Sequence, residues 1–491
     1  QNNPQRERER SAAPPHRETV GDMLGLARVF ATRCPQVGFG AVRGLQTAVS
    51  SALLHLPETK VTTLPNGLRV ATEEGFGETA TVAIFIGTGS RFETEQNNGV
   101  AHFLEHLSFK GTPSLTRRDL EVEIENMGGH LNAFTSREQT AYIAKVMKQD
   151  VGRALEILGD ILQNSKLEES DIDAERSVIL REMDEVNSNM QEFVMDKLHS
   201  VAFRSGGLQH TILGPEENIQ SLKRKDLVDF VQTQYTTDRI VVVGAGAVKH
   251  EELIALTEKL LTKFPTAPPQ GVSVQAEEPV FVSNDLRITN NDFPLAHIAF
   301  AVRTCGFNDP DTLTLMVMQQ LLGSYDVTTG SGKNLSSPLC SRIASDNSFK
   351  CHSVMCFSTP YTDTGLFGAY LVAEHGRLDD LVHLVFTEIR KLTEVSEEEV
   401  ARARNQIKAS LLVDLDGSTQ VTEDIGRQVL TFGRRIPMVE LFARIDAIDA
   451  KQVQRVTNKY FYDKDVASVC FGPIQNLPDL GTFRRWTYSL L

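Results

Sequence analysis

One short run of the sequence has the residue types and spacing of a metal-dependent hydrolase. The run 102–106 reads His-Phe-Leu-Glu-His, and side chains four residues apart lie on the same face of a helix. Two imidazoles so placed can bind one zinc ion, which in a hydrolytic site takes three protein ligands and keeps one position open. Glu105 lies one turn after His102, where it could take a proton from an attacking water. This order is the inverted zinc-peptidase motif, so we expect Glu105 to be the catalytic base.

A third ligand is needed, and two acidic residues further along the chain are candidates. Glu175 and Glu182 are seven residues apart, so they would lie two turns apart on one face of a helix. Glu182 then becomes the candidate ligand, and Glu175 a candidate catalytic residue that orients one of the ligands. The alternative is an ordinary solvated helix face, and the residues alone leave both interpretations open.

The elements that must position these residues follow from hydrophobic pattern and turn residues. We expect a strand over 81–87 and then a helix that begins after the Asn-Asn-Gly run at 97–99 and carries the motif. The segment 131–146 is predicted to form a pair of strands. The segment 170–203 is predicted to form one long helix that carries both acidic candidates.

The order of elements then recurs, which indicates a duplication. Residues 219–243 match residues 445–469 at a constant offset of 226. We therefore expect an α+β fold of two homologous halves, each a mostly antiparallel sheet packed with helices and each burying its own core. The predicted organisation is an N-terminal extension (1–56), a catalytic half (57–265), a Pro-rich linker (266–280) and a non-catalytic half (281–491). The helix of the second half that matches the motif helix has no ligands, and we expect its Met316 and Met318 to be core residues.

The charge balance limits the function classes. The 491 residues include 50 Lys and Arg against 64 Asp and Glu, a formal net charge of −14. This excess of negative charge argues against nucleic-acid binding and suits a basic substrate or partner. The longest apolar run, 240–248, is about half the length of a membrane-spanning helix, so we expect no membrane span in this chain.

The first 56 residues differ from the rest of the chain. They contain seven Arg, no Lys and four acidic residues. An Arg-rich, Lys-free segment with few acidic residues is typical of mitochondrial transit peptides. The alternative is an extension that docks on a partner.

Several runs around the candidate residues resemble a known family. The inverted motif, with Glu182 at its distance inside a duplicated half, resembles the pitrilysin/insulinase family of zinc peptidases. Within that family the chain resembles the branch of mitochondrial processing peptidase β subunits and core 1 proteins of the cytochrome bc1 complex. The resemblance covers 57–491 and is carried by residues 57–72, 89–112, 128–146, 179–186, 246–252 and 423–447.

The resemblance implies a site and a reaction. One Zn²⁺ would be held by His102, His106 and Glu182, with Glu105 as base and Glu175 in support. The expected function is a zinc metalloendopeptidase subunit that removes Arg-rich presequences from proteins imported into mitochondria. It would act in the matrix or at the matrix face of the inner membrane, and only with an α-type subunit or core protein 2. We also expect the chain to be a core subunit of complex III, in contact with the other subunits of that complex. The alternative is a purely structural subunit of complex III with an idle or metal-free site.

The substrate contacts are expected on two elements. In the family, the strand after Gly128-Gly129 binds substrate as an added strand, which here implicates Asn132, Ala133 and Phe134. We also expect Glu192 and Asp196, four residues apart on the helix that carries Glu182, to bind a substrate arginine through charge-assisted hydrogen bonds. The alternative for this pair is an exposed acidic face.

Overall fold

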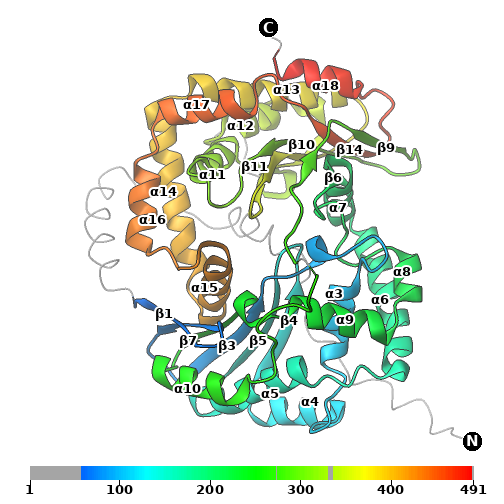
Figure 1. Ribbon diagram of the computed structural model, residues 1–491. Coiled ribbons are helices and arrows are strands. Elements are labelled where there is room, and N and C mark those ends of the chain that lie inside the picture. The colour runs from blue at the N-terminus through cyan, green and yellow to red at the C-terminus, as the bar shows by residue number, and fades with distance from the viewer. Residues whose placement is uncertain (1–56, 273, 330–334, 489–491) are drawn as a thin grey trace, which may run out of the picture.

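The computed structural model describes residues 57–272, 274–329 and 335–488, and it is built around two six-stranded sheets (Figure 1). The predicted extension at 1–56 lies outside the described residues. The first sheet has the order β1-β2-β7-β3-β5-β4. Its strands are β1 (Thr59–Thr63), β2 (Arg69–Glu74), β3 (Thr79–Ile86), β4 (His130–Thr135), β5 (Thr140–Met147) and β7 (Ile240–Gly246). The helices of this part are α3 (Val100–Ser108), α4 (Arg117–Asn126), α5 (Val151–Gln163), α6 (Glu169–Ser188), α7 (Met190–Ala202), α8 (Glu216–Ser221), α9 (Arg224–Gln234) and α10 (His250–Leu260).

The second sheet repeats this plan with the order β11-β12-β13-β10-β14-β9. Its strands are β9 (Asp285–Thr289), β10 (Ala296–Thr304), β11 (Ser324–Asp326), β12 (Cys351–Pro360), β13 (Gly365–Ala373) and β14 (Ala467–Gly472), and a small extra pair joins β6 (Phe203–Ser205) to β8 (Val280–Phe281). The helices are α11 (Asp311–Leu322), α12 (Pro338–Ser345), α13 (Leu378–Lys391), α14 (Glu397–Asp414), α15 (Ser418–Phe432), α16 (Met438–Asp446), α17 (Ala450–Tyr460) and α18 (Leu480–Trp486). Each sheet has one parallel pair of strands, which is β2 with β7 in the first sheet and β14 with β9 in the second. All other pairs in the two sheets are antiparallel.

The repeat found in the sequence is visible in the elements. Helices α9 and α17 begin and end at positions exactly 226 residues apart, and each is followed by an inner strand of its sheet, β7 or β14. The expected fold class, two homologous α+β halves with mostly antiparallel sheets, is confirmed. The division of the chain at 266–280 stays a prediction, and between α10 and β8 the described residues form no helix or strand.

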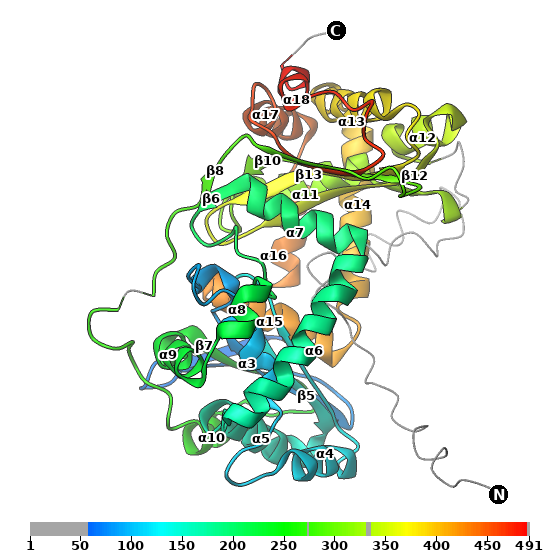
Figure 2. The same cartoon turned by 90° about the vertical axis from the view of Figure 1, so that its right-hand side faces the viewer.

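Each half buries a core of its own, as expected, but the two parts also exchange helices, which was not predicted. Helix α7 crosses to the second sheet, where Val194 and Leu198 join a buried cluster with Ala299 of β10 and Val469 of β14 (Figure 2). In the opposite direction, α15 packs on β3 and β7 of the first sheet (Figure 1). One face of each sheet is therefore covered by a helix from the other part of the chain.

The exchange depends on a helix break that differs from our prediction. The single helix expected over 170–203 is two helices, α6 and α7, which meet at Asn189. Asn189 has φ −81° and ψ 95°, outside the helical region, and its side chain accepts a hydrogen bond from the backbone N–H of Gln191. Asn is a good N-cap residue because its side chain replaces the missing backbone acceptor. The break lets α7 leave the direction of α6 and reach the second sheet.

We expect Gly426→Ala to destabilise the protein through this exchanged packing. A Cβ at Gly426, on α15, would come within 2.5 Å of several atoms of the Phe85 ring on β3, and that ring is fully buried. Overpacking of this kind costs about 1–3 kcal/mol in the free energy of unfolding, which chemical denaturation would measure. Gly152→Ala on α5 is the matched control, because its Cβ would meet nothing closer than 3.6 Å. If both variants were equally stable, the tight contact between α15 and the first sheet would be contradicted.

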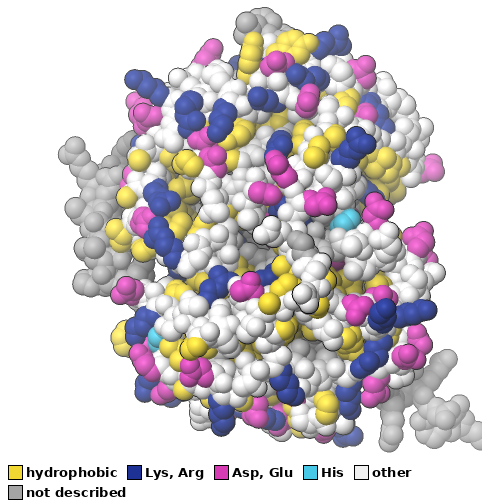
Figure 3. Space-filling model, viewed as in Figure 1, with side chains coloured by type: hydrophobic (Ala, Val, Ile, Leu, Met, Phe, Trp, Pro, Cys, Tyr) yellow, Lys and Arg dark blue, Asp and Glu magenta, His cyan; other side chains and the backbone are white. Residues whose placement is uncertain are grey.

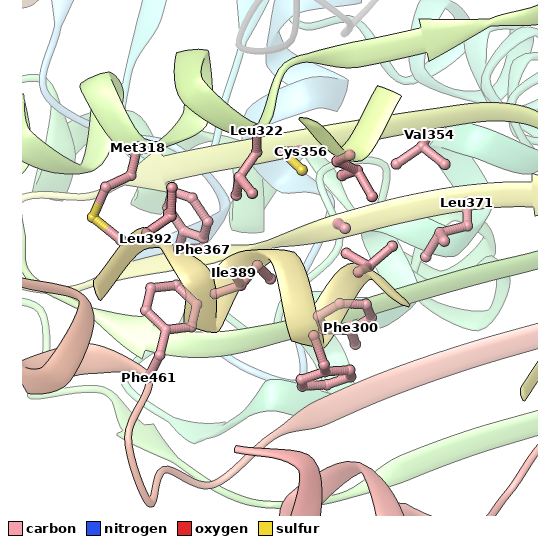
Figure 4. Close-up of a cluster of buried hydrophobic side chains, with 14 of the residues drawn as sticks. Phe300, Met318, Leu322, Val354, Cys356, Phe367, Leu371, Ile389, Leu392 and Phe461 are labelled. Atoms are coloured by element: carbon pink, nitrogen blue, oxygen red, sulfur yellow. The ribbon is translucent and has the colours of Figure 1, made fainter. Parts of the chain in front are cut away.

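The core of the second part has an ordinary apolar composition. It includes Phe300, Met318, Cys356, Phe367 and other buried side chains from strands and helices (Figure 4). Met318 is fully buried and Met316 packs against the same cluster, as expected. Among the helices that the structure describes, none is both long enough and apolar enough to cross a membrane.

Candidate metal centre

Three potential metal ligands from two neighbouring helices meet in space. His102 and His106 lie one turn apart on α3, with their ring centroids 4.7 Å apart, and Glu182 faces them from α6. Oε2 of Glu182 lies 3.0 Å from Nε2 of His106 and 3.9 Å from Nε2 of His102. One ligand atom of each residue lies within 4.8 Å of the others. Two imidazole nitrogens and one carboxylate oxygen at this spacing form the donor set of a catalytic zinc site.

Glu175 lies two turns before Glu182 on α6 and supports the three candidate ligands. Its Oε1 lies 2.9 Å from Nδ1 of His106, and its Oε2 lies 2.5 Å from Nζ of Lys110. Burial alone would raise the pKa of Glu175, but the hydrogen bonds with His106 and Lys110 lower it overall. A carboxylate that accepts from Nδ1–H leaves Nε2 of the same ring available to a metal and fixes the ring's orientation. The sequence pattern did not point to Lys110, because its role depends on the approach of α6.

The acidic surroundings change the protonation of His106. Burial would lower the pKa of this imidazole, but the hydrogen bonds with Glu175 and Glu182 raise it to about 9. The same carboxylates that favour a proton here would favour a divalent cation. A metal ion and a proton therefore compete for Nε2 of His106, as is usual for metal sites.

Glu105 is held beside the group by a strand of the first sheet. Oγ1 of Thr135, the last residue of β4, donates a hydrogen bond of 2.6 Å to Oε2 of Glu105. Burial raises the pKa of Glu105, and the bond from Thr135 partly offsets that shift. A carboxyl whose pKa moves towards neutrality is better suited to general-base catalysis. Sequence analysis did not identify Thr135, although it closes the strand that was expected to bind substrate.

The expected substrate strand lies at an edge of the first sheet. Asn132, Ala133 and Phe134 belong to β4, the last strand in the order of that sheet. Asn132 is exposed, whereas Ala133 and Phe134 are partly buried, and α3 packs beside the strand. An edge strand has unpaired main-chain groups, to which an extended peptide can add.

The acidic pair Glu192 and Asp196 lies on α7 and not, as expected, on the helix that carries Glu182. The break at Asn189 separates the two helices, and the Asn189 amide donates a hydrogen bond of 2.8 Å to Glu192. Asp196 accepts one of 2.6 Å from Arg137, which follows β4 in the turn towards β5. Part of the negative charge of Asp196 is therefore already balanced inside the chain.

Comparison with known proteins now identifies the family. Residues 69–216 match the family model described as Insulinase (Peptidase family M16), and residues 221–407 match the Peptidase M16 inactive domain. The chain belongs to the insulinase family of peptidases. The motif residues and both acidic candidates lie in the first match, and α11, the counterpart of the motif helix, lies in the second.

Full-length relatives place the chain within this family more narrowly. It is 53% identical over 439 residues to the probable mitochondrial-processing peptidase subunit beta of Arabidopsis thaliana, covering 89% of this chain and 82% of the relative. It is 49% identical to the mitochondrial-processing peptidase subunit beta of Bos taurus, covering 92% of each chain, and 48% identical to that of Homo sapiens, covering 94% and 93%. The resemblance expected from the sequence is therefore confirmed.

A chain of one solved structure shares the fold. A chain of complex III2 from Candida albicans, with Inz-5 bound, superposes with a TM-score of 0.79 at 26% identity, over 88% of this chain and 100% of that one. Peptidases of family M16 are metal-dependent, which agrees with the donor set on α3 and α6.

Proposed function

We propose that this chain is the zinc-binding, catalytic subunit of an endopeptidase that removes Arg-rich presequences from proteins imported into mitochondria. The observation that carries the proposal is the group of His102, His106 and Glu182, with Glu105 beside it at the open edge of β4. The relatives are named as subunits of a mitochondrial processing peptidase, which supports a processing peptidase of the mitochondrion. We propose that it acts in the matrix or at the matrix face of the inner membrane.

Each residue of the site has a distinct task in this proposal. One zinc ion held by the three ligands would act as a Lewis acid on the scissile carbonyl and lower the pKa of the attacking water. Glu105 accepts the proton of that water and then passes it to the leaving amine. Thr135 holds one oxygen of Glu105, which leaves the other free for the proton. Glu175 keeps His106 oriented towards the metal.

The internal repeat supports the proposed position of the substrate. Successive cross-strand pairs lead from Asn132 of β4 to Ile143 of β5, then to Ala83 of β3 and finally to Val243 of β7. In the second sheet, the same row of pairs leads from Met355 of β12 to Tyr370 of β13, to Ala299 of β10 and to Val469 of β14. Val469 is the repeat partner of Val243, so Met355 has the position of Asn132. Strand β12 is thus the counterpart of β4.

The second sheet has a strand of its own at a place where the described residues of the first sheet have none. Strand β11 pairs with β12 in antiparallel orientation, with Ser324 opposite Met355. In the first sheet, the equivalent place beside Asn132 is left open by the described residues. We propose that a substrate takes this place, antiparallel to β4, and that main-chain pairing allows many different presequences to bind.

We propose that Glu192 and Asp196 recognise a substrate arginine, and we expect their replacement to reduce that preference. In the double variant Glu192→Gln/Asp196→Asn, the ratio of kcat/KM for an Arg-bearing presequence peptide over its Arg→Ala analogue should fall about tenfold or more, as expected for loss of charge-assisted hydrogen bonds. Peptide cleavage followed by mass spectrometry measures this ratio. The single variant Glu192→Gln separates the effect from the bond between Asp196 and Arg137.

A charge-matched control guards against a general electrostatic effect. Glu169→Gln/Asp173→Asn removes two acidic side chains that are also four residues apart, on exposed positions of α6. An unchanged Arg preference in the first double variant, or an equal loss in this control, would rule out specific recognition by Glu192 and Asp196.

We propose that cleavage requires an α-type subunit, such as that of the processing peptidase or core protein 2. Two homologous halves place one open edge beside the metal ligands, and a second subunit of the same fold would enclose the bound peptide. The experiment is to assay presequence cleavage by this chain with and without the α-type partner. Cleavage at an equal rate by the chain alone would contradict the requirement, and no cleavage by the zinc-loaded pair would contradict the proposed peptidase.

A second function is favoured by one observation, the superposition on a chain of complex III2. We propose that the chain is also a core subunit of complex III, in contact with its other subunits. The two functions are compatible, and the alternative of a purely structural subunit with an idle site is tested by the same cleavage assay on the intact membrane complex.

A further inference from the structure

A buried carboxylate outside the proposed site holds the start of the helix that bears the histidines. Glu93 is 6% exposed and follows the short turn Ser90–Phe92. Its Oε1 accepts a hydrogen bond of 2.7 Å from the backbone N–H of Ala101. Its Oε2 accepts one of 2.8 Å from the backbone N–H of Gly99 and one of 2.7 Å from the side chain of Asn98. Both oxygens are thus committed to the first turn of α3.

This arrangement replaces a cap that α3 cannot make locally. The N-cap residue is Gly99, which has φ 102° and no side chain to accept a hydrogen bond. Another residue type would not fit there, because a Cβ would come 2.7 Å from the carbonyl oxygen of Leu213. The free N–H groups at a helix start need an acceptor, and a negative charge is favourable at that end. Glu93 supplies both from outside the helix.

The segment that carries Glu93 is itself fixed. Two residues earlier, the Arg91 side chain is 2% exposed and pairs with Glu138 at 2.5 Å and with Asp363 at 2.6 Å. Asp363 belongs to the turn between β12 and β13 of the second sheet. The acceptor for α3 is therefore anchored to both parts of the chain. Burial raises the pKa of Glu93 to about 7, against three hydrogen bonds that lower it.

The consequence for the metal ligands follows from the length of the helix. Helix α3 has nine residues, and His102 comes directly after Ala101, the residue whose N–H is bound by Glu93. Both histidines project from this short rigid rod, so a change at its first turn displaces both Nε2 atoms relative to Glu182. A metal site needs its ligand atoms held closely in place, so such a displacement would weaken metal binding.

We propose that Glu93 is a positioning residue for the metal centre: its carboxylate sets the first turn of α3 so that His102 and His106 face Glu182 together. This inference rests on the proposed metal-dependent function and adds a residue to it. Glu93 acts through α3 and is not expected to contact metal or substrate.

The test compares Glu93→Gln with wild type in the full chain bound to its α-type partner. Gln keeps the shape of the side chain but turns an NH₂ group towards the backbone donors. We expect faster amide hydrogen exchange over residues 99–103 of the metal-free protein and an altered visible spectrum of the cobalt(II)-loaded protein. Cobalt should be released about 10–100-fold faster, the usual effect of losing a supporting group. In the zinc-loaded protein kcat should fall while KM stays nearly constant.

Two further variants make the outcome decisive. Asp311→Asn is the matched control, since Asp311 is a buried carboxylate at the start of α11, the counterpart helix, where it pairs with Arg455 and Lys459. It should lower stability without changing the cobalt spectrum or release. Asn98→Ala removes one donor to Glu93 and should give a smaller change in the same direction, which keeps the test available if Glu93→Gln does not fold.

The possible failures are distinguishable. Wild-type cobalt release and spectrum in the Glu93→Gln protein, or in Asn98→Ala if the former does not fold, would overturn the positioning role. A wild-type protein that binds cobalt but cleaves no peptide would overturn the proposed peptidase alone, because the cobalt comparison still decides the role of Glu93. A wild-type protein that binds no metal would overturn both.

Discussion

Glu105→Gln is expected to abolish most of the peptidase activity while the metal stays bound. Glutamine keeps the size of the side chain and can still accept the hydrogen bond from Thr135, but it cannot take a proton. Loss of a general base costs about 10²–10⁴-fold in rate. We therefore expect kcat for a presequence peptide to fall by that range with little change in KM, and zinc content by mass spectrometry of the intact protein to equal that of wild type.

The control for this variant is Thr135→Val, which keeps the carboxylate but removes its hydrogen bond. It should retain more activity than Glu105→Gln, because the base is still present although less well oriented. Glu105→Gln with near-wild-type turnover would show that another group accepts the proton, and loss of zinc in that variant would move Glu105 from base to metal ligand.

Glu182→Ala is expected to remove both the metal and the activity. It deletes the carboxylate that lies 3.0 Å from Nε2 of His106 and leaves two imidazoles as the only ligands from this group. Glu175→Gln should weaken zinc binding about 10–100-fold, because it removes support for His106 but no ligand. The predicted order of zinc affinity, measured by competition with a chelating dye, is wild type, then Glu175→Gln, then Glu182→Ala.

The matched control on α6 is Asp184→Asn, an exposed acidic residue two positions after Glu182. It changes the net charge by the same amount and should bind zinc as wild type does. Equal zinc affinity in Glu182→Ala and Asp184→Asn would contradict the assignment of Glu182 as third ligand.

Features that depend on local pattern could be predicted from the sequence. The helix expected after the Asn-Asn-Gly run at 97–99 is α3, which begins at Val100, and the offset of 226 residues reappears in the bounds of α9 and α17. The spacing of His102 and His106 on α3 and the seven-residue spacing on α6 also depend only on helical geometry. The approach of Glu182 to both histidines depends instead on the packing of α6 against α3, and only the resemblance to the family implied it.

Features that depend on contacts between distant segments could not be predicted. The exchange of α7 and α15 between the sheets is decided by which apolar faces fit together, as the close approach of Gly426 to Phe85 illustrates. One local signal was available at the helix break, since Asn189 is a favourable N-cap residue inside a helical pattern. Thr135 and Glu93 follow no helical spacing relative to the residues that they hold, so only the folded structure connects them to Glu105 and to α3.

The most direct test of the proposed zinc peptidase is a metal titration of activity. The metal-free chain, bound to its α-type partner, is titrated with zinc while cleavage of an Arg-bearing presequence peptide is followed by mass spectrometry. We expect no cleavage without metal and a linear rise that stops at one zinc ion per chain, with Glu182→Ala showing no such rise. Cleavage that is independent of zinc, or a zinc-loaded pair that leaves the peptide intact, would contradict the account.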